Sequence, residues 1–249
     1  RLFELAELKL LVDSVQASKF ITAKKSIQLI KKIEGLASKY EAAQLQRQVY
    51  TTERVKAGNE AIYYNVDQIH TAIASDVQIT FQYFNWDIHK NQVMKKDGAL
   101  YCVSPWALSW DDENYYLVGY EKDHGIRHYR VDKMKAIAVL DESRLEESGY
   151  RDFDPAVYSN KVFGMYGGES ETVTLSFPMK LTGVMLDRFG KDVLLKKESE
   201  EVYRVRTDVV ISGHFFGWLA GLGKQVRIIS PDSVRQQYKQ YLSDILEDI

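Results

Sequence analysis

The residues best suited to binding a ligand lie within residues 104–134, where aromatic side chains, a turn and an Arg/His-rich stretch follow one another. If the stretch that ends at Arg130 is extended, His128 and Arg130 share one face of the strand and Arg127 lies on the other. The preceding stretch, residues 115–120, is rich in tyrosine. Aromatic rings beside Arg and His form a surface on which bases can stack while phosphates are paired. The segment therefore favours binding of a flat, negatively charged molecule over catalysis.

The same residues are also compatible with a purely structural role. The tyrosines could form a core, and Arg130 could pair with Asp132 or another carboxylate. Residue pattern alone favours this interpretation. A shift of one residue in strand register would also reverse every face, so the sequence leaves open which side chains point outward.

Signatures of catalysis and of metal binding are missing from the sequence. No G-x-x-x-x-G-K-[ST] phosphate loop occurs, and Gly217, Gly221 and Gly223 follow an aromatic helix where a dinucleotide fingerprint requires a strand. His124 and His128 are four residues apart, but a hairpin between them separates their faces, and no Cys or carboxylate cluster completes a zinc site. We therefore expect a protein that is not an enzyme and that needs no cofactor or metal.

The composition is that of an ordinary globular protein, with 249 residues of which 45% are hydrophobic and 27% charged. No apolar run approaches the roughly 20 residues that cross a bilayer, and the first residues do not resemble a signal peptide. The single cysteine, Cys102, lies in an apolar stretch, where we expect a buried strand thiol, and it cannot form an internal disulfide. A cytoplasmic location is therefore expected.

Charge is unevenly distributed along the chain. Residues 1–60 contain 11 Lys and Arg against 7 Asp and Glu, a net charge of +4, whereas the whole chain has a net charge of −2. A basic amino-terminal region is one indication of nucleic-acid binding. Solvated helix faces would give the same excess, and the sequence favours that simpler explanation.

The amino-terminal region, residues 1–75, is predicted to be helical. Apolar residues recur at 3-4-3 spacing along one stripe of a first helix, at Leu5, Leu8, Val12 and Val15. A second helix is predicted from about Ala23, with Thr22 as its N-cap. Its apolar row is Ile27, Ile30, Ile33 and Ala37. Two helices this short cannot bury both stripes against each other, so we expect dimerisation, although a small helical subdomain within one chain would give the same pattern.

Residues 76–142 are predicted to form a small barrel. Their hydrophobic period is two, which is the signature of half-buried strands. Asp97-Gly98 predicts a hairpin between residues 90–96 and 99–103, and two further tight turns follow. Ahead of the barrel, the pattern Asn65-x-x-Gln68 predicts the capped start of a short helix. Five or six short strands joined by tight turns are typical of a closed barrel.

Residues 143–169 are predicted to be a linker with helical potential after Asp154, and residues 170–249 to be an α/β domain. In this last region a strand, a helix, a pair of strands, a second helix and a further strand precede a final helix from Pro231. Strands separated by two helices that cover one sheet face are typical of a ferredoxin-like α/β sandwich. The predicted fold class is therefore α+β.

Six motifs follow the order that is found in a known family. They are Ser104-Pro105-Trp106, Tyr115-Tyr116-Leu117, residues 127–134 (RHYRVDKM), residues 186–190 (LDRFG), Trp218-Leu219 with residues 221–223, and residues 230–234 (SPDSV). Together they resemble the WYL-domain family of bacterial transcriptional regulators. The tripeptide that names the family corresponds to Tyr115-Tyr116-Leu117, so tyrosine replaces its tryptophan, and Trp106 stands where the family more often has tyrosine.

The resemblance implies a Sm-like, SH3-type barrel that senses a ligand, followed by a carboxy-terminal extension domain. Nucleic acid or nucleotides are the implied effectors. The first helices, including Ser18-Lys19-Phe20-Ile21, resemble the linker to a winged helix-turn-helix, which this chain does not show before Arg1. We therefore expect operator DNA to be bound through a domain that is absent from this chain. The implied ligand-binding residues are Ser104, Trp106, Tyr116, Arg127, His128 and Arg130.

Our hypothesis is that the chain is the effector-sensing and dimerisation region of a cytoplasmic regulator, with a negatively charged ligand bound on the barrel. Effector binding would change the mutual orientation of the amino-terminal helices. The first alternative is a structural interaction module whose barrel binds protein and no small ligand. The second is a nucleotide-processing enzyme, which the lack of an acid–base or metal arrangement disfavours.

Overall fold

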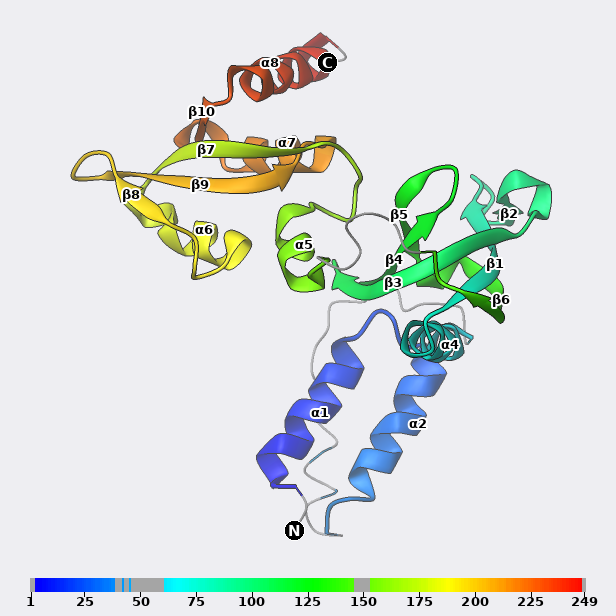
Figure 1. The fold of residues 1–249 in the computed structure, drawn as a ribbon. Helices are drawn as coiled ribbons and strands as arrows, with labels where there is room; N and C mark the ends of the chain where they lie inside the picture. Colours follow the sequence, from blue (N-terminus) through cyan, green and yellow to red (C-terminus); the bar gives the residue numbers. More distant parts are fainter. Residues whose placement is uncertain (1–2, 39–41, 43–44, 46–60, 146–152, 248–249) are drawn as a thin grey trace. The chain divides into compact units, whose positions relative to one another are not determined.

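In the computed structural model of the protein, the chain divides into two units, Arg1–Glu146 and Glu147–Ile249. The structure describes residues 3–38, 42, 45, 61–145 and 153–247, so parts of the predicted regions 1–75 and 143–169 lie outside the described residues. Figure 1 shows the elements of both units. Within the described residues, no helix combines the length and the apolar character that a membrane crossing requires.

The first unit begins with a helical hairpin of α1 (Leu5–Ala17) and α2 (Ala23–Glu34), drawn in blue in Figure 1. The sequence predicts the start of α2 correctly, because the Thr22 hydroxyl accepts a hydrogen bond from the backbone N–H of Lys25 at 3.2 Å. This bond satisfies one of the backbone donors that every helix leaves unpaired in its first turn.

The apolar stripes of α1 and α2 pack against each other. Leu8 and Val12 are buried together with Leu45, and Ile30 and Ile33 of α2 lie against them. Leu45, which lies beyond the two helices, completes this cluster, and Ile27 of the predicted α2 row stays 57% exposed. The two helices therefore do not cover both stripes by themselves, and part of the cover comes from the same chain.

The strands of the first unit form one antiparallel sheet. They are β1 (Val77–Trp86), β2 (Gln92–Met94), β3 (Tyr101–Asp111), β4 (Asn114–Glu121), β5 (Gly125–Arg130) and β6 (Met134–Ser143). The order is β2-β1-β3-β4-β5, and β6 also pairs with β1. Among the described residues no ladder joins β5 to β6, so the sheet is a curled half-barrel and not the closed barrel that the strand spacing predicts.

The segments on either side of Asp97-Gly98 pair with β1 and not with each other. Met94 lies opposite Phe84, and Tyr101 lies opposite Phe81. The predicted hairpin across this dipeptide is therefore wrong, although the backbone does turn there in a short 3-10 segment, η1 (Lys95–Gly98). A local turn signal marks a change of direction but cannot choose the partner strand, which here is the ten-residue β1.

Helix α4 (Ile62–Ala74) packs against the half-barrel and contributes Ile62, Ile69 and Ala72 to its core. The helix begins before Asn65, so the predicted capping role of this residue is wrong. The side chain of Asn65 is buried and donates from Nδ2 to the carbonyl oxygens of Val131, at 3.5 Å, and Met134, at 3.2 Å. It thereby ties the short turn η2 (Val131–Lys133), which links β5 to β6, to α4.

The second unit contains the elements in the order that the sequence predicts. Its strands are β7 (Ser170–Pro178), β8 (Leu195–Lys197), β9 (Val202–Val210) and β10 (Arg227–Ser230), and its helices are α5 (Pro155–Lys161), α6 (Thr182–Phe189), α7 (Gly213–Gly221) and α8 (Asp232–Glu247). The strand order is β10-β7-β9-β8 and every neighbouring pair is antiparallel. Val173, Leu175 and Phe177 of β7 are buried in its core. The protein as described is thus a mixed α and β fold.

Candidate ligand-binding site

Strands β3, β4 and β5 bring most of the predicted contact residues to one face. Residues that lie opposite each other in an antiparallel pair share a face of the sheet. Arg130 lies opposite Tyr116, His128 lies opposite Val118, and Ser104 lies opposite Tyr120. The register therefore places Ser104, Tyr116, His128 and Arg130 on the same side.

Arg127 lies on the other face of β5. It is opposite Gly119, in line with the core residues Leu117 and Tyr129, but its own side chain is exposed. The structure therefore separates Arg127 from His128 and Arg130, as alternation along an extended strand requires.

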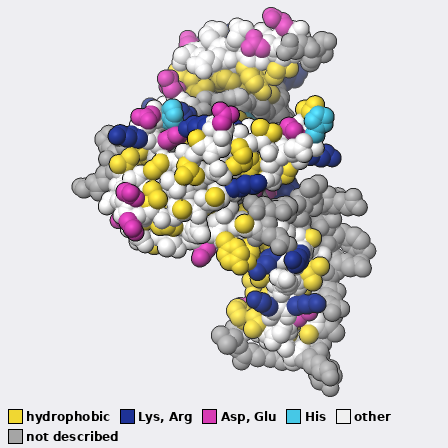
Figure 2. Space-filling view, turned by 90° about the vertical axis from the view of Figure 1, so that its right-hand side faces the viewer, with side chains coloured by type: hydrophobic (Ala, Val, Ile, Leu, Met, Phe, Trp, Pro, Cys, Tyr) yellow, Lys and Arg dark blue, Asp and Glu magenta, His cyan; other side chains and the backbone are white. Residues whose placement is uncertain are grey.

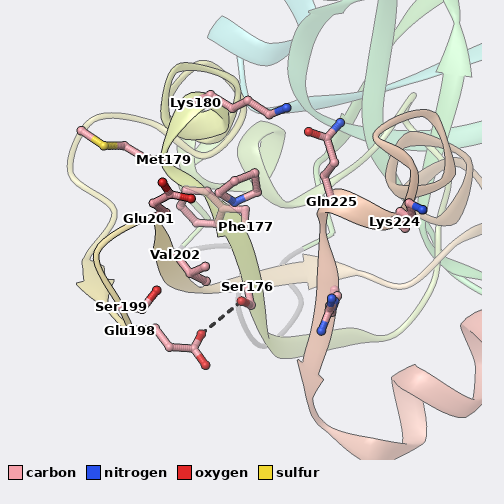
Figure 3. A pocket seen from close by; sticks show the side chains of 12 residues that line it. Ser176, Phe177, Met179, Lys180, Glu198, Ser199, Glu201, Val202, Lys224 and Gln225 are labelled. Carbon is pink, nitrogen blue, oxygen red and sulfur yellow. Dashed lines mark hydrogen bonds between the residues drawn. The ribbon is translucent and has the colours of Figure 1, made fainter.

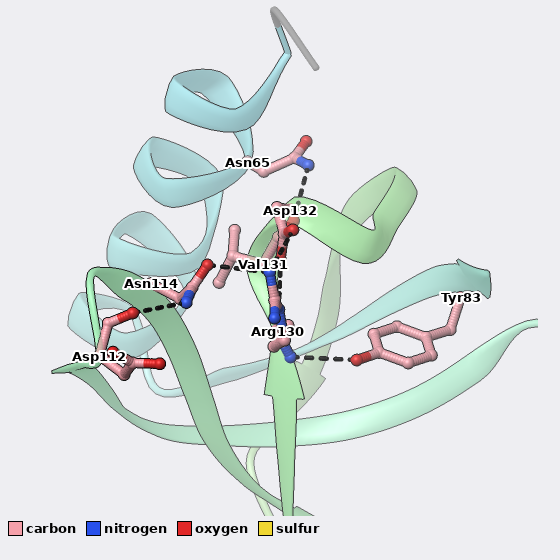
Figure 4. Close-up of polar contacts among 7 residues, drawn as sticks. All are labelled: Asn65, Tyr83, Asp112, Asn114, Arg130, Val131 and Asp132. Carbon is pink, nitrogen blue, oxygen red and sulfur yellow. Dashed lines mark hydrogen bonds and ion pairs between the residues drawn. The ribbon is translucent and has the colours of Figure 1, made fainter. Parts of the chain in front are cut away.

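Arg130 is held in a dense polar network, which Figure 4 shows. Its Nε donates to Asp132 Oδ1 at 3.0 Å, and its Nη2 donates to Asp132 Oδ2 at 2.8 Å and to Asn114 Oδ1 at 2.9 Å. These hydrogen bonds to Asp132 raise the pKa of the guanidinium. Its backbone N–H donates to the Tyr83 hydroxyl at 3.2 Å. The ion pair with Asp132 is the structural alternative that the sequence left open.

The pair with Asp132 leaves part of the guanidinium accessible. The side chain of Arg130 remains 36% exposed. Within the described residues its Nη1 makes no hydrogen bond, so two N–H groups are left for a ligand. A guanidinium fixed by a carboxylate and an amide is oriented before a ligand arrives, which lowers the entropic cost of binding.

Two lysines add positive charge near Arg130. Burial and the neighbouring Arg130 charge lower the pKa of Lys133. Lys95 also lies close, with its Nζ 5.7 Å from the centre of the Tyr83 ring. Neither these lysines nor Asn114 are among the predicted contact residues. Lys133 directly follows Asp132 in the RHYRVDKM motif, but nothing in the local sequence shows that Lys95 and Asn114 approach Arg130.

Tyr116 and His128 are half-buried on the candidate face. Burial raises the pKa of Tyr116, so its hydroxyl is protonated at neutral pH. The Tyr116 ring lies opposite Arg130, and His128 lies two residues before Arg130 on the same face of β5. Their place as ligand contacts stays a prediction.

Ser104 and Trp106 are buried and take part in packing. The Ser104 hydroxyl accepts a hydrogen bond from the backbone N–H of Leu145 at 2.9 Å. Trp106 is 6% exposed and stacks on Tyr120, with 6.1 Å between ring centres. Both residues lie beside the candidate face, but a ligand would have to reach them past their present neighbours.

Cys102 is exposed, contrary to the prediction of a buried strand thiol. It alternates along β3 with Tyr101 and Val103, which are buried, and its Sγ donates to Gln78 Oε1 at 3.3 Å. The surrounding residues are apolar, so the sequence does not show that Cys102 points away from the core. The polar partner of its thiol, Gln78, belongs to another strand, β1. In the part of the chain that the structure describes, no group of three or more His, Cys, Asp and Glu residues could hold a metal ion.

Comparison with known families identifies both units. The WYL domain model matches residues 64–139, and the WCX domain model matches residues 169–246. The chain is a WYL-domain protein with a WCX domain. The WYL match includes α4 from Tyr64 onward, all strands of the half-barrel except the end of β6, and the network around Arg130. The WCX match includes the four-stranded sheet of the second unit.

Two solved structures are similar to this chain at low sequence identity. One is proteasome accessory factor B/C (PafBC) of Arthrobacter aurescens, with 18% identity, a TM-score of 0.31, and coverage of 69% of this chain and 25% of that chain. The other is a CRISPR Cas-related protein, with 14% identity, a TM-score of 0.42, and coverage of 87% of this chain and 60% of that chain. The present chain thus spans a quarter of the first protein and 60% of the second. A search of the curated proteins finds no match.

Proposed function

We propose that the chain is the effector-sensing and dimerisation region of a cytoplasmic bacterial transcriptional regulator. In this proposal the WYL domain binds a negatively charged ligand, either single-stranded nucleic acid or a nucleotide. The observation that carries the proposal is the Arg130 guanidinium, which Asp132 and Asn114 orient while Nη1 keeps its donors. An arginine that is oriented in this way and keeps free N–H donors suits phosphate recognition, because the donors of the planar guanidinium match phosphate oxygens. This is a binding role, and no turnover of the ligand is part of it.

The contacts follow from the two faces of β5. Arg130 and His128 would pair with phosphate groups, and the Tyr116 ring beside them would stack on a base. Arg127 would reach the ligand only around the end of the strand. Ser104 would line the site from beneath, as would Trp106.

The folds of both domains fit this role. In the half-barrel, consecutive strands β3, β4 and β5 are neighbours, a short 3-10 turn precedes β6, and β6 returns to pair with β1. This topology supports a Sm-like, SH3-type arrangement. The β10-β7-β9-β8 order, in which two helices connect the strands, supports a ferredoxin-like sandwich for the WCX domain. We propose the boundaries 1–75, 76–142, 143–169 and 170–249 for the helical region, the barrel, the linker and the extension domain.

The turn between β3 and β4 connects the candidate face to the amino-terminal helices. Asn114 of this turn accepts a hydrogen bond from Arg130, and its neighbour Glu113 pairs with Lys19 at 2.6 Å. Phe20 lies against Tyr115, with 4.7 Å between ring centres. A ligand that displaces the Asn114 contact would therefore shift the turn on which the α1–α2 loop rests. Such a shift is a physical route from effector to helix orientation.

Dimerisation is proposed on the apolar side chains that the helical hairpin leaves exposed. Leu10 is 66% exposed and Ile27 is 57% exposed. Figure 2 shows apolar side chains among the Lys and Arg side chains of this region, at the bottom of the view. Burial of such side chains in a dimer would be favourable. Operator DNA would then be bound through an amino-terminal domain carried by each subunit.

The proposal is tested by titrating the full chain with fluorescent single-stranded DNA, RNA and nucleotides. Arg130→Ala should weaken binding by roughly tenfold or more, since one charge-assisted contact is worth about 1.5–3 kcal/mol. The matched control is Lys122→Ala on the exposed β4–β5 turn. Binding should also weaken steeply with salt if phosphates dominate. Equal affinity of Arg130→Ala and wild type would remove this face from the proposed function.

A structural interaction module is the second candidate, and one observation favours it. The Ser104 hydroxyl and two nitrogen atoms of the Arg130 guanidinium bond within the chain, and Trp106 stacks on Tyr120, as expected for residues that hold a fold together. In this case the WYL domain binds a protein. Recovery of a defined protein partner, together with flat titrations for every nucleic acid and nucleotide, would support it.

A further inference from the structure

The four-stranded sheet of the WCX domain has one covered face and one open face. Along β7, Val173, Leu175 and Phe177 are buried in the core, and the alternate residues point away from it. The buried residues of α6, α7 and α8 all belong to this same core cluster. In the described part of the chain, these helices therefore leave the second face open, except at its Thr172–Asp208 end, where Lys161 of α5 bonds to Asp208.

The open face carries cations and hydroxyl groups in rows across the strands. The first row, from β10 to β8, consists of Arg227, Ser176, Arg204 and Lys196. The second row consists of Ser230, Thr174 and Arg206. These residue types make most of the protein contacts to phosphate and sugar in nucleic-acid complexes.

Two acidic residues beside the rows are already neutralised. Glu198 accepts hydrogen bonds from Arg204 Nε at 2.7 Å and from the Ser176 hydroxyl at 3.1 Å. Asp208 accepts from the Thr172 hydroxyl at 2.6 Å and from Lys161 Nζ at 3.0 Å, and these two contacts lower its pKa. At longer range Arg227 also lowers the pKa of Glu198 and Arg206 that of Asp208, so each carboxylate is shared between a directly bonded cation and a more distant one.

Three cations of the face have no ion pair among the described residues, namely Lys196, Arg206 and Arg227, and all three are exposed. Neighbouring strands are about 4.8 Å apart, and alternate residues of one strand are about 6.7 Å apart. The three charges therefore lie within one to three strand spacings of each other. A surplus of positive charge on this scale attracts an extended polyanion.

One end of the face is hollowed into a groove of about 910 Å³. Its lining includes Arg227 from the face, Lys180 and Lys224 from the neighbouring loops, and the carboxylates of Glu198 and Glu201. Figure 3 shows Lys224 on the side of the groove opposite Ser199. The groove thus adds two lysines near the edge of the sheet, whose charge the two glutamates partly offset.

We propose that the open face of the WCX sheet binds the phosphate backbone of single-stranded nucleic acid. A sheet of four strands is about 14 Å wide before side chains are counted, whereas the major groove of B-DNA is about 12 Å wide. The sheet is therefore too wide to enter a duplex groove, whereas a flexible single strand can follow the rows across it. The two rows hold no aromatic residue, so the contacts are to phosphates and the binding is tolerant of base sequence. This site is separate from the WYL-domain face and does not depend on the function proposed for that face.

The test compares the full chain with the double variant Arg206→Ala/Arg227→Ala in titrations with a labelled 12-nucleotide single strand at several salt concentrations. Each lost phosphate contact should lower the steepness of the log–log salt dependence by about 0.7, and the two losses together should weaken binding roughly 20-fold at 0.1 M salt. The matched control is Arg235→Ala/Lys239→Ala, which removes the same charge from α8. The variant Arg206→Lys/Arg227→Lys keeps the charge and should keep most of the salt dependence.

Separate variants distinguish this site from the one on the WYL domain. If the sheet variant binds like the α8 control while Arg130→Ala binds weakly, the WCX site is refuted and the WYL function stands. If the sheet variant binds weakly and Arg130→Ala binds like wild type, the WCX site stands and the function proposed for the WYL domain is refuted. An oligoglutamate peptide of equal charge is the last arm of the test. Competition by this peptide at the same concentration as the oligonucleotide would show a general anion surface and overturn the assignment.

Discussion

Arg130 and Asp132 form a bidentate ion pair although only one residue separates them in the chain. Two parallel hydrogen bonds, at 3.0 Å and 2.8 Å, join the guanidinium to the carboxylate. The turn η2 that follows β5 brings the carboxylate back towards the guanidinium. An anionic ligand on this face would therefore meet an arginine whose charge is already shared, and it would have to compete with Asp132.

This competition predicts that Asp132→Asn increases the affinity for anionic ligands. The amide keeps the shape of the side chain and one acceptor but removes the negative charge, so Arg130 is left with more charge for phosphate. We expect binding of a single-stranded oligonucleotide to tighten about three- to tenfold, measured by fluorescence anisotropy. The control is Asp123→Asn on the exposed β4–β5 turn. Weaker or unchanged binding by Asp132→Asn would show that Arg130 is not a ligand contact.

The buried amide of Asn65 is predicted to stabilise the first unit. Asn65→Ala leaves the carbonyl oxygens of Val131 and Met134 without their donor, which costs roughly 1–3 kcal/mol of unfolding free energy. Gln68→Ala, on the exposed side of α4, should change stability by less than about 0.5 kcal/mol. Urea unfolding followed by circular dichroism measures both. Equal midpoints for the two variants would contradict the structural role of Asn65.

Asn65 and Thr22 show what the sequence could and could not predict. Both were predicted as caps from local patterns, and Thr22 is one because its partner, the N–H of Lys25, lies three residues away. Asn65 instead bonds to carbonyl groups 66 and 69 residues away in the chain, in η2 and at the start of β6. Periodicity likewise located nearly every helix and strand, but the partner strand of β2 depends on the long β1 and not on the turn at Asp97-Gly98.

For the candidate site too, the sequence predicts what depends on local backbone geometry and not what depends on contacts between strands. Alternation along β5 correctly separates Arg127 from His128 and Arg130, because it depends only on backbone geometry. The burial of Ser104 and the approach of Asn114 to Arg130 arise from contacts between strands. Such contacts become visible only when the register is known.

Gly119 on β4 is predicted to tolerate no side chain. A Cβ atom there would lie 2.5 Å from Val103 Cγ1 and 3.1 Å from the carbonyl oxygen of Ser104. Gly119→Ala should therefore destabilise the half-barrel by roughly 1–3 kcal/mol through overpacking. Gly183→Ala, in α6 where no atom lies within 4 Å of the new Cβ, should instead be neutral or stabilising by up to about 1 kcal/mol. Thermal unfolding of both variants tests the pair, and similar losses of stability would contradict the predicted clash.

Alkaline pH is predicted to destabilise the first unit through Tyr83. Burial raises the pKa of Tyr83 from 10.0 to about 12, so its proton is held more tightly in the folded state than in the unfolded state. The tighter hold on this proton contributes to the free energy of unfolding. The contribution is complete below pH 10 and is lost as the pH rises towards 12, because Tyr83 releases its proton at a lower pH in the unfolded state. The loss is on the order of 3 kcal/mol. Urea unfolding of Tyr83→Phe between pH 9 and pH 12 should show a shallower decline than wild type, and an identical decline would exclude Tyr83 as its source.

Dimerisation through the helical hairpin predicts a specific effect of Leu10. This side chain is 66% exposed beside the α1–α2 contact, and Leu10→Lys would place a charge in any interface formed there, which is costly unless the charge is paired. Wild type should show a dimeric mass by light scattering at micromolar concentration, and Leu10→Lys a monomeric mass. Ile88→Lys, at a position that is 92% exposed on the β1–β2 turn, should stay dimeric and controls for the added charge. A monomeric mass of wild type over the whole micromolar range would end the proposal, because Leu45 of the same chain already covers part of the apolar stripes.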